Sequence, residues 1–451
     1  MSIFKACDIR GIAETELTDA VVTGLAQAIG VKLTGQRIVV GSDVRLSSPR
    51  LRKIVVRELV DSGCEVIDLG TVATPIFYYA VKSQRATGGV MITASHNPAP
   101  YNGLKMMLGD MPVSEADILA IQELYERKAK IRKPGTRLKV DLIDEYITAM
   151  AKKAQKGKMK IVLDAGNGAV SDFAPRLYRA CGYDVVELFC TADGNFPNRP
   201  PNPALPQNLT ALCEKVKACG ADMGIAFDGD GDRAAFVDET GRAVDNDDIL
   251  VLLARHFLQE KKGCVVYDAK CSMVVPEQIA LAGGRPLMAR AGHTFIKDRF
   301  LKEQAVFAGE ISGHFFFCEL GYDDGMFGGL KVCEYVASHG KLSRLIDDIP
   351  NYLLTAELRV TYLADDKEAV LQQIANKLTA YQVNLIDGVR VEFTDGWGMI
   401  RSSVTEPLFT LRFEAKTQKR LLEIEQILLA ALPMDLCEQV REKLIESDGV
   451  E

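Results

Sequence analysis

In Met223-Gly224-Ile225-Ala226-Phe227-Asp228-Gly229-Asp230-Gly231-Asp232-Arg233, an apolar run leads directly into three aspartates that alternate with glycine. The apolar run predicts a buried strand. Three carboxylates placed so close together repel one another unless a cation lies between them, and carboxylate oxygens suit Mg²⁺. The glycines let the backbone fold tightly around an ion. A solvated acidic turn is the alternative, but it does not require this strict alternation. The segment therefore predicts a metal site formed by Asp228, Asp230 and Asp232.

The composition is that of an ordinary globular protein. The chain has 451 residues, of which 47% are hydrophobic and 25% charged. This length is too great for one hydrophobic core, so we expect about three or four domains. The formal net charge of −7 argues against a nucleic-acid partner. An anionic small-molecule substrate would therefore need a local cluster of Arg, Lys and His.

Cysteine usage and hydropathy indicate the compartment. The 11 cysteines include no C-x-x-C pair, which predicts reduced and mostly buried thiols. Residues 1–5 lack the apolar run of a signal peptide, and no stretch approaches the roughly 18 apolar residues that a membrane span needs. We therefore expect a cytoplasmic protein with no membrane segment.

One pattern of secondary structure occurs three times along the chain. Each copy has a short β-rich strand, a helix that ends at a glycine, a second strand, and a third strand that ends in polar residues. The expected first strands are 38–43, 161–166 and 265–270; the glycines are Gly63, Gly182 and Gly283; the second strands are 65–69, 184–188 and 285–289; the third strands are 90–93, 223–227 and 305–308. This alternation predicts layered α/β domains.

A polar loop follows each of the three third strands. The loops are Thr93-Ala94-Ser95-His96-Asn97-Pro98, the aspartate loop 228–233, and Gly309-Glu310-Ile311-Ser312-Gly313-His314. Ligands of α/β sheets gather beyond the carboxyl ends of the strands. Three repeats packed with these ends together would combine a serine, a metal and a polar recognition loop. Chance similarity between strand–helix–strand units is the alternative, and the matched placement of the loops weighs against it.

From about Tyr352 the pattern changes to an α+β module of about 100 residues. Strands are expected at 357–363, 389–393 and 408–413, and helices near 367–380 and 419–431. Between the last two strands lies Arg401-Ser402-Ser403-Val404-Thr405-Glu406-Pro407. Arginine and hydroxyl groups on one loop suit phosphate, although an ordinary Ser/Thr loop has the same composition. Residues 348–351 are a plausible hinge before this module.

These motifs together resemble the bacterial phosphomannomutase/phosphoglucomutase group of the α-D-phosphohexomutase superfamily. The matching segments are 93–98, 228–233, 309–314, 401–407, 8–11, 101–105 and 292–297, in family order across essentially the whole chain. The resemblance implies four domains around a central cleft: three repeated α/β domains with mixed sheets, and a C-terminal α+β domain with a TATA-box-binding-protein-like fold. The expected boundaries are 1–140, 141–241, 242–353 and 354–451.

The resemblance also implies a reaction. Ser95 would carry a phosphoryl group and complete a Mg²⁺ site with Asp228, Asp230 and Asp232. Transfer to a phosphosugar would give a hexose 1,6-bisphosphate, which turns around and returns a phosphoryl group to the serine. The result is reversible exchange between the 1- and 6-positions of mannose phosphates, and of glucose phosphates as well. A bare serine would need hexose 1,6-bisphosphate as an activator.

The remaining site residues are carried over from the family motifs. Arg10 and Lys105 would stabilise charge and assist proton transfer beside the phosphoserine, although Lys105 is alternatively only a charge partner. Glu310 and Ser312 would hold the 3- and 4-hydroxyls of the sugar, and His314 would bind sugar or move a proton. The other expected substrate contacts are Arg233, Lys270 and His293, with Arg401, Ser403 and Thr405 around the non-reacting phosphate.

Two departures and three alternatives accompany this hypothesis. Relatives usually carry Asn at the position of Val404, and many carry Tyr at that of Cys7, so we expect a side-chain contact at each place to be missing. A backbone amide can still donate at the position of Val404. A phosphoglucosamine mutase, a metal-dependent sugar-phosphate phosphatase and a catalytically silent binding protein are the alternative functions. The apparent phosphate loop at 401–407 favours a mutase over a phosphatase. We expect a monomer or a weak homo-oligomer.

Overall fold

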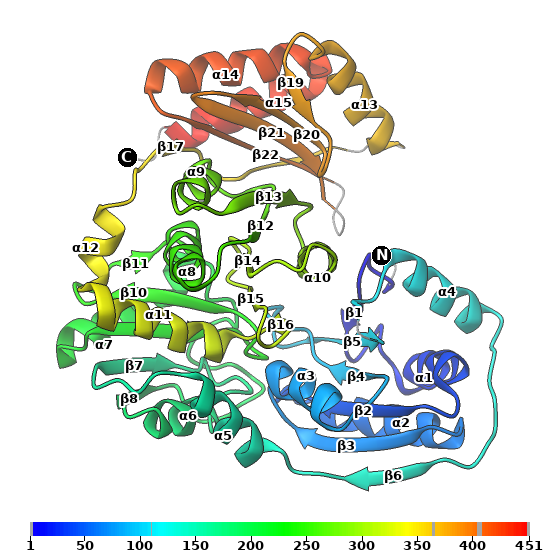
Figure 1. Ribbon diagram of the computed structural model, residues 1–451. Helices are drawn as coiled ribbons and strands as arrows, with labels where there is room; N and C mark the ends of the chain where they lie inside the picture. The colour runs from blue at the N-terminus through cyan, green and yellow to red at the C-terminus, as the bar shows by residue number, and fades with distance from the viewer. Residues whose placement is uncertain (1–2, 110, 363–365, 404–407, 449–451) are drawn as a thin grey trace.

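The computed structural model describes residues 3–109, 111–362, 366–403 and 408–448. The described strands form four sheets that follow one another along the chain, and we call each sheet with its helices a module. Figure 1 shows the four modules arranged in an arc that begins with module 1 and ends with module 4. The expected organisation of three α/β units with mixed sheets and a C-terminal α+β unit is confirmed.

Module 1 has a mixed sheet in the order β1-β5-β4-β2-β3-β6. Its elements are β1 (Ile9–Ile12), α1 (Asp19–Leu33), β2 (Arg37–Ser42), α2 (Ser48–Asp61), β3 (Glu65–Thr71), α3 (Thr74–Ser83), β4 (Gly88–Ile92), β5 (Tyr101–Leu108), α4 (Glu115–Glu126) and β6 (Thr136–Lys139). Strand β2 runs parallel to β3 and β4, and β5 runs antiparallel to β4.

Module 2 repeats this core in the order β11-β10-β9-β7-β8. Its elements are α5 (Ile143–Lys153), β7 (Lys160–Asp164), α6 (Ala174–Ala180), β8 (Asp184–Leu188), the 3-10 helix η1 (Pro206–Leu209), α7 (Thr210–Cys219), β9 (Met223–Phe227), β10 (Ala234–Asp238) and β11 (Ala243–Val244). Strand β7 is parallel to β8 and β9, and β10 is antiparallel to β9.

Module 3 has the same core in the order β13-β12-β14-β15-β16. Its elements are α8 (Asn246–Glu260), β12 (Cys264–Asp268), α9 (Val274–Leu281), β13 (Arg285–Ala289), α10 (His293–Lys302), β14 (Phe307–Gly309), β15 (Phe315–Phe317), β16 (Tyr322–Asp323), α11 (Gly325–His339) and α12 (Leu342–Asp347). Strand β12 is parallel to β13 and β14, and β15 is antiparallel to β14.

The threefold repeat is therefore genuine, and it explains where the polar loops lie. In each copy a parallel third strand turns back into an antiparallel strand: β4 into β5, β9 into β10, and β14 into β15. The loops with Ser95, the three aspartates and Glu310 are the connections of these three hairpins. The helix-ending glycines are confirmed as well, since Gly63, Gly182 and Gly283 follow their helices with φ of 86°, 92° and 78°.

Module 4 is an antiparallel sheet covered by helices, which confirms the expected α+β composition. Its elements are β17 (Leu353–Leu354), β18 (Leu358–Thr361), α13 (Lys367–Lys377), β19 (Gln382–Asn384), β20 (Val389–Phe393), β21 (Gly396–Ser402), β22 (Leu408–Ala415), α14 (Gln418–Ala431) and α15 (Met434–Asp448). The likeness to the TATA-box-binding-protein fold stays a prediction.

Two features of module 4 differ from the sequence-based expectation. The composition predicts a loop from Arg401, whereas the structure places Arg401 and Ser402 at the end of β21. This strand forms because Ile400 packs in the module core while Trp397 and Met399 pack against Ala269 of module 3. Helix α15 was not expected from the sequence.

The buried cores show how the modules are joined. One large apolar cluster runs from Val39 in module 1 to Ile349 after α12, so modules 1 to 3 share a continuous core. Module 4 has a cluster of its own, and only the small group of Ala269, Trp397 and Met399 joins it to module 3 among the clusters of the described residues. Module 4 is therefore the unit least constrained by apolar packing.

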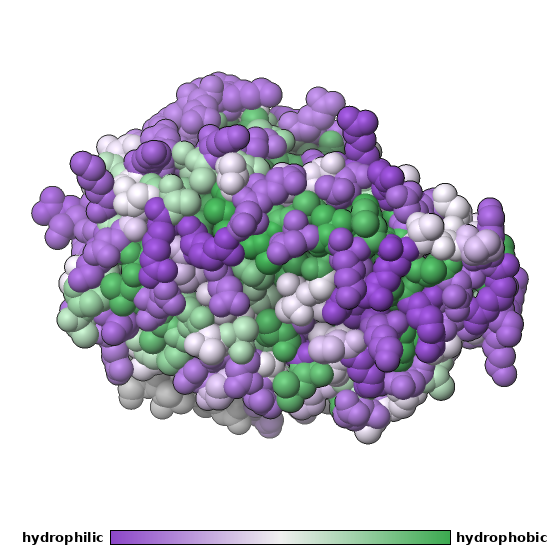
Figure 2. All heavy atoms as spheres, turned by 90° about the horizontal axis from the view of Figure 1, so that it is seen from below, coloured by the Kyte–Doolittle hydropathy of each residue, from purple (hydrophilic) through white to green (hydrophobic). Residues whose placement is uncertain are grey.

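The part of the surface seen in Figure 2 is mainly polar. Figure 2 shows a face on which hydrophilic residues predominate and hydrophobic residues lie in small groups between them. Among the described helices, none combines the length and the apolar character that a bilayer-spanning segment needs.

Candidate functional site

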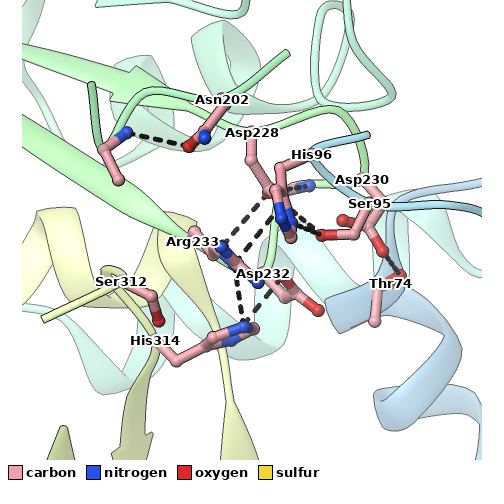
Figure 3. A network of polar contacts seen from close by, with 12 residues as sticks. Thr74, Ser95, His96, Asn202, Asp228, Asp230, Asp232, Arg233, Ser312 and His314 are labelled. Atoms are coloured by element: carbon pink, nitrogen blue, oxygen red, sulfur yellow. Dashed lines mark hydrogen bonds and ion pairs between the residues drawn. The ribbon is translucent and has the colours of Figure 1, made fainter. Parts of the chain in front are cut away.

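Ser95 lies where β4 turns toward β5, and its side chain points at the aspartate loop of module 2 (Figure 3). Its hydroxyl donates a hydrogen bond to Asp228 Oδ2 at 2.7 Å. The backbone has a φ of 48°, which is left-handed, and the Ser95 N–H donates to Thr93 Oγ1 at 2.9 Å. A non-glycine residue in this region stores backbone strain, which is typical of functional sites.

Arg45, which follows β2, holds the serine loop in place. Its side chain is fully buried, pairs with Asp43 at 3.1 Å, and donates to the carbonyls of Ser95 at 2.7 Å and Asn97 at 2.6 Å. It also donates to the carbonyls of Pro98 and Tyr101. One guanidinium thus donates to three carbonyls of the loop and to that of Tyr101, the first residue of β5.

The three aspartates of the metal loop are fully buried and close together. One ligand oxygen of each lies within 4.8 Å of the others. Asp228 Oδ1 accepts from the backbone N–H of Gly231 at 2.9 Å and of Arg233 at 3.2 Å. Burial and the neighbouring carboxylates of Asp230 and Asp232 raise the pKa of Asp228 well above its ordinary value.

This donor set fits a divalent cation. Within the described residues, Asp230 Oδ1 and Asp232 Oδ1 are buried oxygens with no hydrogen-bond partner. A buried oxygen without a partner is costly, and a cluster of such oxygens from carboxylates matches the hard ligands that Mg²⁺ takes. The expected metal ligands are therefore brought together with Ser95 beside them.

Module 1 contributes two cationic residues, Lys105 against the aspartate cluster and Arg10 against the neighbouring serine loop. Lys105, on β5, contacts Asp232 Oδ2 directly and lies 4.0 Å from Asp230 Oδ2. Burial alone lowers the pKa of Lys105, but the combined effect of Asp232, Tyr78, Asp230 and Asp323 outweighs it, and the pKa lies well above its ordinary value. Arg10, on β1, donates to Asn97 Oδ1 at 2.8 Å beside the serine loop.

Arg233 and His314 connect the aspartate loop to module 3. Arg233 Nε donates to His314 Nε2 at 2.9 Å, and His314 Nδ1 lies 2.7 Å from Asp323 Oδ2. The ring of His293, the first residue of α10, stacks on the ring of His314 with 5.4 Å between centroids. Burial and then the charge of Lys105 lower the pKa of His293 well below its ordinary value.

The loop of module 3 presents a carboxylate and a hydroxyl. Glu310 is buried, and its Oε2 accepts from Ser312 Oγ at 2.8 Å. In the described part of the chain, Glu310 Oε1 is buried with no hydrogen-bond partner. Burial raises the pKa of Glu310 above its ordinary value. This side chain is thus prepared to accept a hydrogen bond from a ligand hydroxyl.

The remaining expected residues form separate groups. Lys270, after β12, lies 3.8 Å from Glu357 Oε1 of module 4. Arg401 Nε lies 3.0 Å from Asp387 Oδ2, and the Ser403 N–H donates to the Leu408 carbonyl at 2.9 Å. Thr405 and Val404 fall outside the described residues. Among the described contacts, none joins Arg401 or Ser403 to Ser95 or to the metal loop.

Sequence reasoning missed three residues of this site. Arg45, Asp323 and Thr74 each support a site residue, through the serine loop, His314 and Asp230 respectively. Each residue has a weak indication in the sequence: a charged pair directly after β2 for Arg45, two adjacent aspartates at 323–324 for Asp323, and a Thr-Pro pair that begins a helix for Thr74. None of these features identifies the residue that each side chain contacts, because those contacts form only in the folded chain.

Comparisons with known proteins agree with this architecture. Family models described as phosphoglucomutase/phosphomannomutase α/β/α domains I, II and III match residues 1–132, 144–241 and 245–352, and the corresponding C-terminal domain matches 357–431. A phosphomannomutase/phosphoglucomutase of Pseudomonas aeruginosa is 38% identical over 94% of each chain. A phosphoglucomutase of Neisseria gonorrhoeae is 38% identical over 94% of this chain and 95% of its own.

A solved structure shows the same fold. A phosphoglucomutase/phosphomannomutase family protein from Burkholderia thailandensis superimposes with a TM-score of 0.87 at 34% identity, covering 99% of this chain and 98% of that one. Three repeated α/β modules, a fourth α+β module, and a serine beside three buried aspartates are the marks of a phosphohexomutase, an isomerase. The chain belongs to the phosphoglucomutase/phosphomannomutase family.

Proposed function

We propose that this chain interconverts hexose 1-phosphates and hexose 6-phosphates, with Ser95 as the residue that carries the transferred phosphoryl group. The observation that carries the proposal is the hydrogen bond from Ser95 Oγ to Asp228, inside a cluster of three buried aspartates. Two of these, Asp230 and Asp232, each have a buried oxygen without a hydrogen-bond partner among the described residues. The names of the relatives from Pseudomonas and Neisseria support mannose and glucose phosphates as substrates.

Asp228, Asp230 and Asp232 would hold Mg²⁺ together with the phosphorylated Ser95. When bound, the ion would withdraw charge from the phosphoryl group and so favour its transfer. The unpartnered Oδ1 atoms of Asp230 and Asp232 support this assignment. Hexose 1,6-bisphosphate is proposed as the intermediate, and as the activator of a chain whose serine is bare.

The cationic residues around Ser95 would stabilise the charge that develops during transfer. Lys105 keeps its proton beside Asp232, as the direction of its pKa indicates, so charge stabilisation is its supported role. Its part in proton transfer stays a prediction. Arg10, which lies beside Asn97, and Arg233, which lies 4.0 Å from Asp228, would face the oxygens of the phosphoryl group.

Substrate recognition would be divided between modules 3 and 4. Glu310 and Ser312 would take the 3- and 4-hydroxyls of the sugar, which the unpartnered Glu310 Oε1 supports. Lys270, His293 and His314 would complete the contacts from module 3. Arg401, Ser403 and Thr405 would anchor the phosphate that does not react, so that either end of the bisphosphate can face Ser95 in turn.

Each proposed domain would have one role in the reaction. Domain 1–140 would supply the nucleophile, 141–241 the metal ligands, 242–353 the sugar contacts, and 354–451 the phosphate anchor. The substrate is a small phosphosugar, and the chain acts as a monomer or a weak homo-oligomer. We place it in the cytoplasm, because all 11 of its cysteines are free and such thiols persist in reducing compartments.

The first experiment compares turnover of mannose 1-phosphate, glucose 1-phosphate and glucosamine 1-phosphate, with Mg²⁺ and a trace of hexose 1,6-bisphosphate. We expect similar rates on mannose and glucose. Ser95→Ala should abolish turnover while sugar-phosphate binding survives, and Ser83→Ala, exposed at the end of α3, should act as wild type. Full activity of Ser95→Ala would overturn the mechanism.

The same assay separates the alternatives. A strong preference for glucosamine 1-phosphate would assign the chain to the phosphoglucosamine mutases, one of which, a probable enzyme of Methanothermobacter thermautotrophicus, is 35% identical. Release of free phosphate without an isomerised sugar would indicate a phosphatase. Binding of phosphosugars without any turnover would indicate a silent binding protein.

A further inference from the structure

Thr74, the first residue of α3, is fully buried against the metal loop of the next module. Its hydroxyl donates a hydrogen bond to Asp230 Oδ2 at 2.6 Å, and its backbone N–H donates to the Asp230 carbonyl at 2.8 Å (Figure 3). A single residue of module 1 thus holds both the backbone and the side chain of one expected metal ligand in module 2.

The three aspartates of the loop are oriented by different means. Asp228 accepts from the loop's own N–H groups of Gly231 and Arg233, and from Ser95. Asp232 is paired with Lys105. Asp230 has the Thr74 hydroxyl as its close side-chain partner, with Lys105 farther away at 4.0 Å.

The Thr74 hydroxyl determines which oxygen of Asp230 stays available. With Oδ2 occupied, Oδ1 is the oxygen that remains buried without a partner among the described residues. Groups that hydrogen-bond to metal ligands from behind fix the orientation of those ligands, and their loss typically weakens metal affinity about 10- to 100-fold. A carboxylate without this contact is free to rotate and to pair with Lys105 instead.

The backbone contact has a separate effect. The serine loop and the metal loop pack directly on each other, since a Cβ atom added at Gly229 would lie 2.5 Å from the Ser95 carbonyl oxygen. The N–H of Thr74 fastens the same loop, at Asp230, to module 1. The spacing between the serine and the aspartates is therefore set partly by α3.

We propose that Thr74 is a positioning residue for the metal site, whose hydroxyl aligns the Asp230 carboxylate for the cation. The inference rests on the proposed function, because it takes Asp230 as a metal ligand. It assigns no contact with substrate to Thr74. Its effect should therefore appear in metal affinity rather than in the binding of phosphosugar.

The test measures binding of Mn²⁺, as a probe for Mg²⁺, by electron paramagnetic resonance of the free ion in titrations of the full chain. Thr74→Val keeps the shape and removes the hydroxyl, and we expect its dissociation constant to rise about 10- to 100-fold. Thr74→Ser restores the hydroxyl and should bind nearly as wild type. Thr71→Val, at the exposed end of β3, is the matched control.

Kinetics give a second readout. For Thr74→Val, the Mg²⁺ concentration at half-maximal rate should rise, and saturating Mg²⁺ should restore most of kcat while the KM for phosphosugar stays unchanged. A rise in the KM for phosphosugar with unchanged metal affinity would overturn the positioning role. Wild-type Mn²⁺ affinity in Thr74→Val would overturn it as well.

Asp230→Asn separates failure of this inference from failure of the proposed function. If wild type binds Mn²⁺ and Asp230→Asn does not, while Thr74→Val binds as wild type, only the inference is overturned. If Asp230→Asn binds Mn²⁺ as tightly as wild type, the proposed metal site itself is wrong. Should Thr74→Val fail to fold, Thr74→Ser and Thr74→Ala form a second pair, and equal Mn²⁺ affinity in these two would overturn the inference.

Discussion

Arg233 Nε donates a hydrogen bond to His314 Nε2 at 2.9 Å, and this contact determines which nitrogen of the imidazole carries the proton. Arginine can only donate, so Nε2 must accept. The proton therefore lies on Nδ1, which donates to Asp323 Oδ2 at 2.7 Å. His314 is held as one neutral tautomer between a carboxylate and a guanidinium, and it positions Arg233 4.0 Å from Asp228.

Asp323→Asn should lower kcat roughly 10-fold, because a neutral amide holds Nδ1–H less firmly than a carboxylate does. The alignment of Arg233 would then be less well defined, whereas the KM for phosphosugar should change less than kcat. Steady-state kinetics of the variant test this. Asp298→Asn, on the outer part of α10, is the control and should act as wild type. An unchanged kcat in Asp323→Asn would show that Arg233 does not depend on this chain of hydrogen bonds.

Arg45→Lys should reduce both stability and activity. A lysine has three N–H donors and cannot replace all four contacts that Arg45 makes to the carbonyls of residues 95, 97, 98 and 101. A buried carbonyl left without a partner, such as that of Ser95, costs about 1–3 kcal/mol. We expect a fall of several degrees in melting temperature and a lower kcat. Arg50→Lys, whose arginine pairs with Asp19 nearer the surface, should change neither. A variant with wild-type melting and rate would mean that the loop holds its shape without Arg45.

Arg401→Ala should weaken binding of 1-phosphosugars and 6-phosphosugars to the same extent. In the proposed mechanism one anchor serves both half-reactions, so its loss should raise both KM values by a similar factor, about 10-fold or more for a charged contact. Measuring the reaction in both directions tests this. Arg441→Ala, on the exposed side of α15, is the control. A loss confined to one substrate would show that the two phosphates use different anchors.

Asp247 should make the stability of the protein depend on pH. This residue, near the start of α8, lines a cavity of about 450 Å³ between modules 2, 3 and 4. Burial raises its pKa from 3.8 to about 7, against an opposing effect of Arg412. The folded state therefore favours the protonated acid, and stability falls as pH rises from about 4 to about 7, by about 1.4 kcal/mol per pKa unit.

Asp247→Asn should remove this penalty. Its gain in melting temperature over wild type should be small at pH 5 and larger at pH 8, where the wild-type carboxyl must ionise in the folded protein. Melting curves at both values measure the difference. Asp184→Asn, at an exposed position of β8, should show no such growth with pH. Equal gains at pH 5 and pH 8 would contradict the raised pKa.

The sequence was sufficient for the parts of the fold that local rules specify. The glycines at 63, 182 and 283 end their helices through the left-handed backbone that glycine adopts easily, and the apolar run before Asp228 forms the expected strand. The metal loop was predictable because its aspartates are neighbours in the sequence. A solvated acidic turn is the alternative for such a segment, but it does not require aspartates that alternate strictly with glycine.

The parts that depend on distant contacts were not predictable in the same way. Trp397 lies in a strand because it packs against Ala269 of another module, so the local composition around Arg401 was misleading. From the sequence, Thr74 resembles an ordinary helix start and Asp323 an ordinary surface acid. In the fold, Thr74 contacts Asp230 and Asp323 contacts His314. The role of each residue depends on a partner that the sequence alone does not identify.

The left-handed backbone of Ser95, with its φ of 48°, also restricts which hydroxyl amino acid can stand there. Threonine carries the same nucleophilic group, but a β-branched side chain is a genuine outlier at positive φ. Serine combines a hydroxyl with a single substituent on Cβ and tolerates the turn. The hairpin thus restricts the residue at the position of the proposed phosphoryl carrier: of the two amino acids with an aliphatic hydroxyl, the backbone geometry favours the unbranched one.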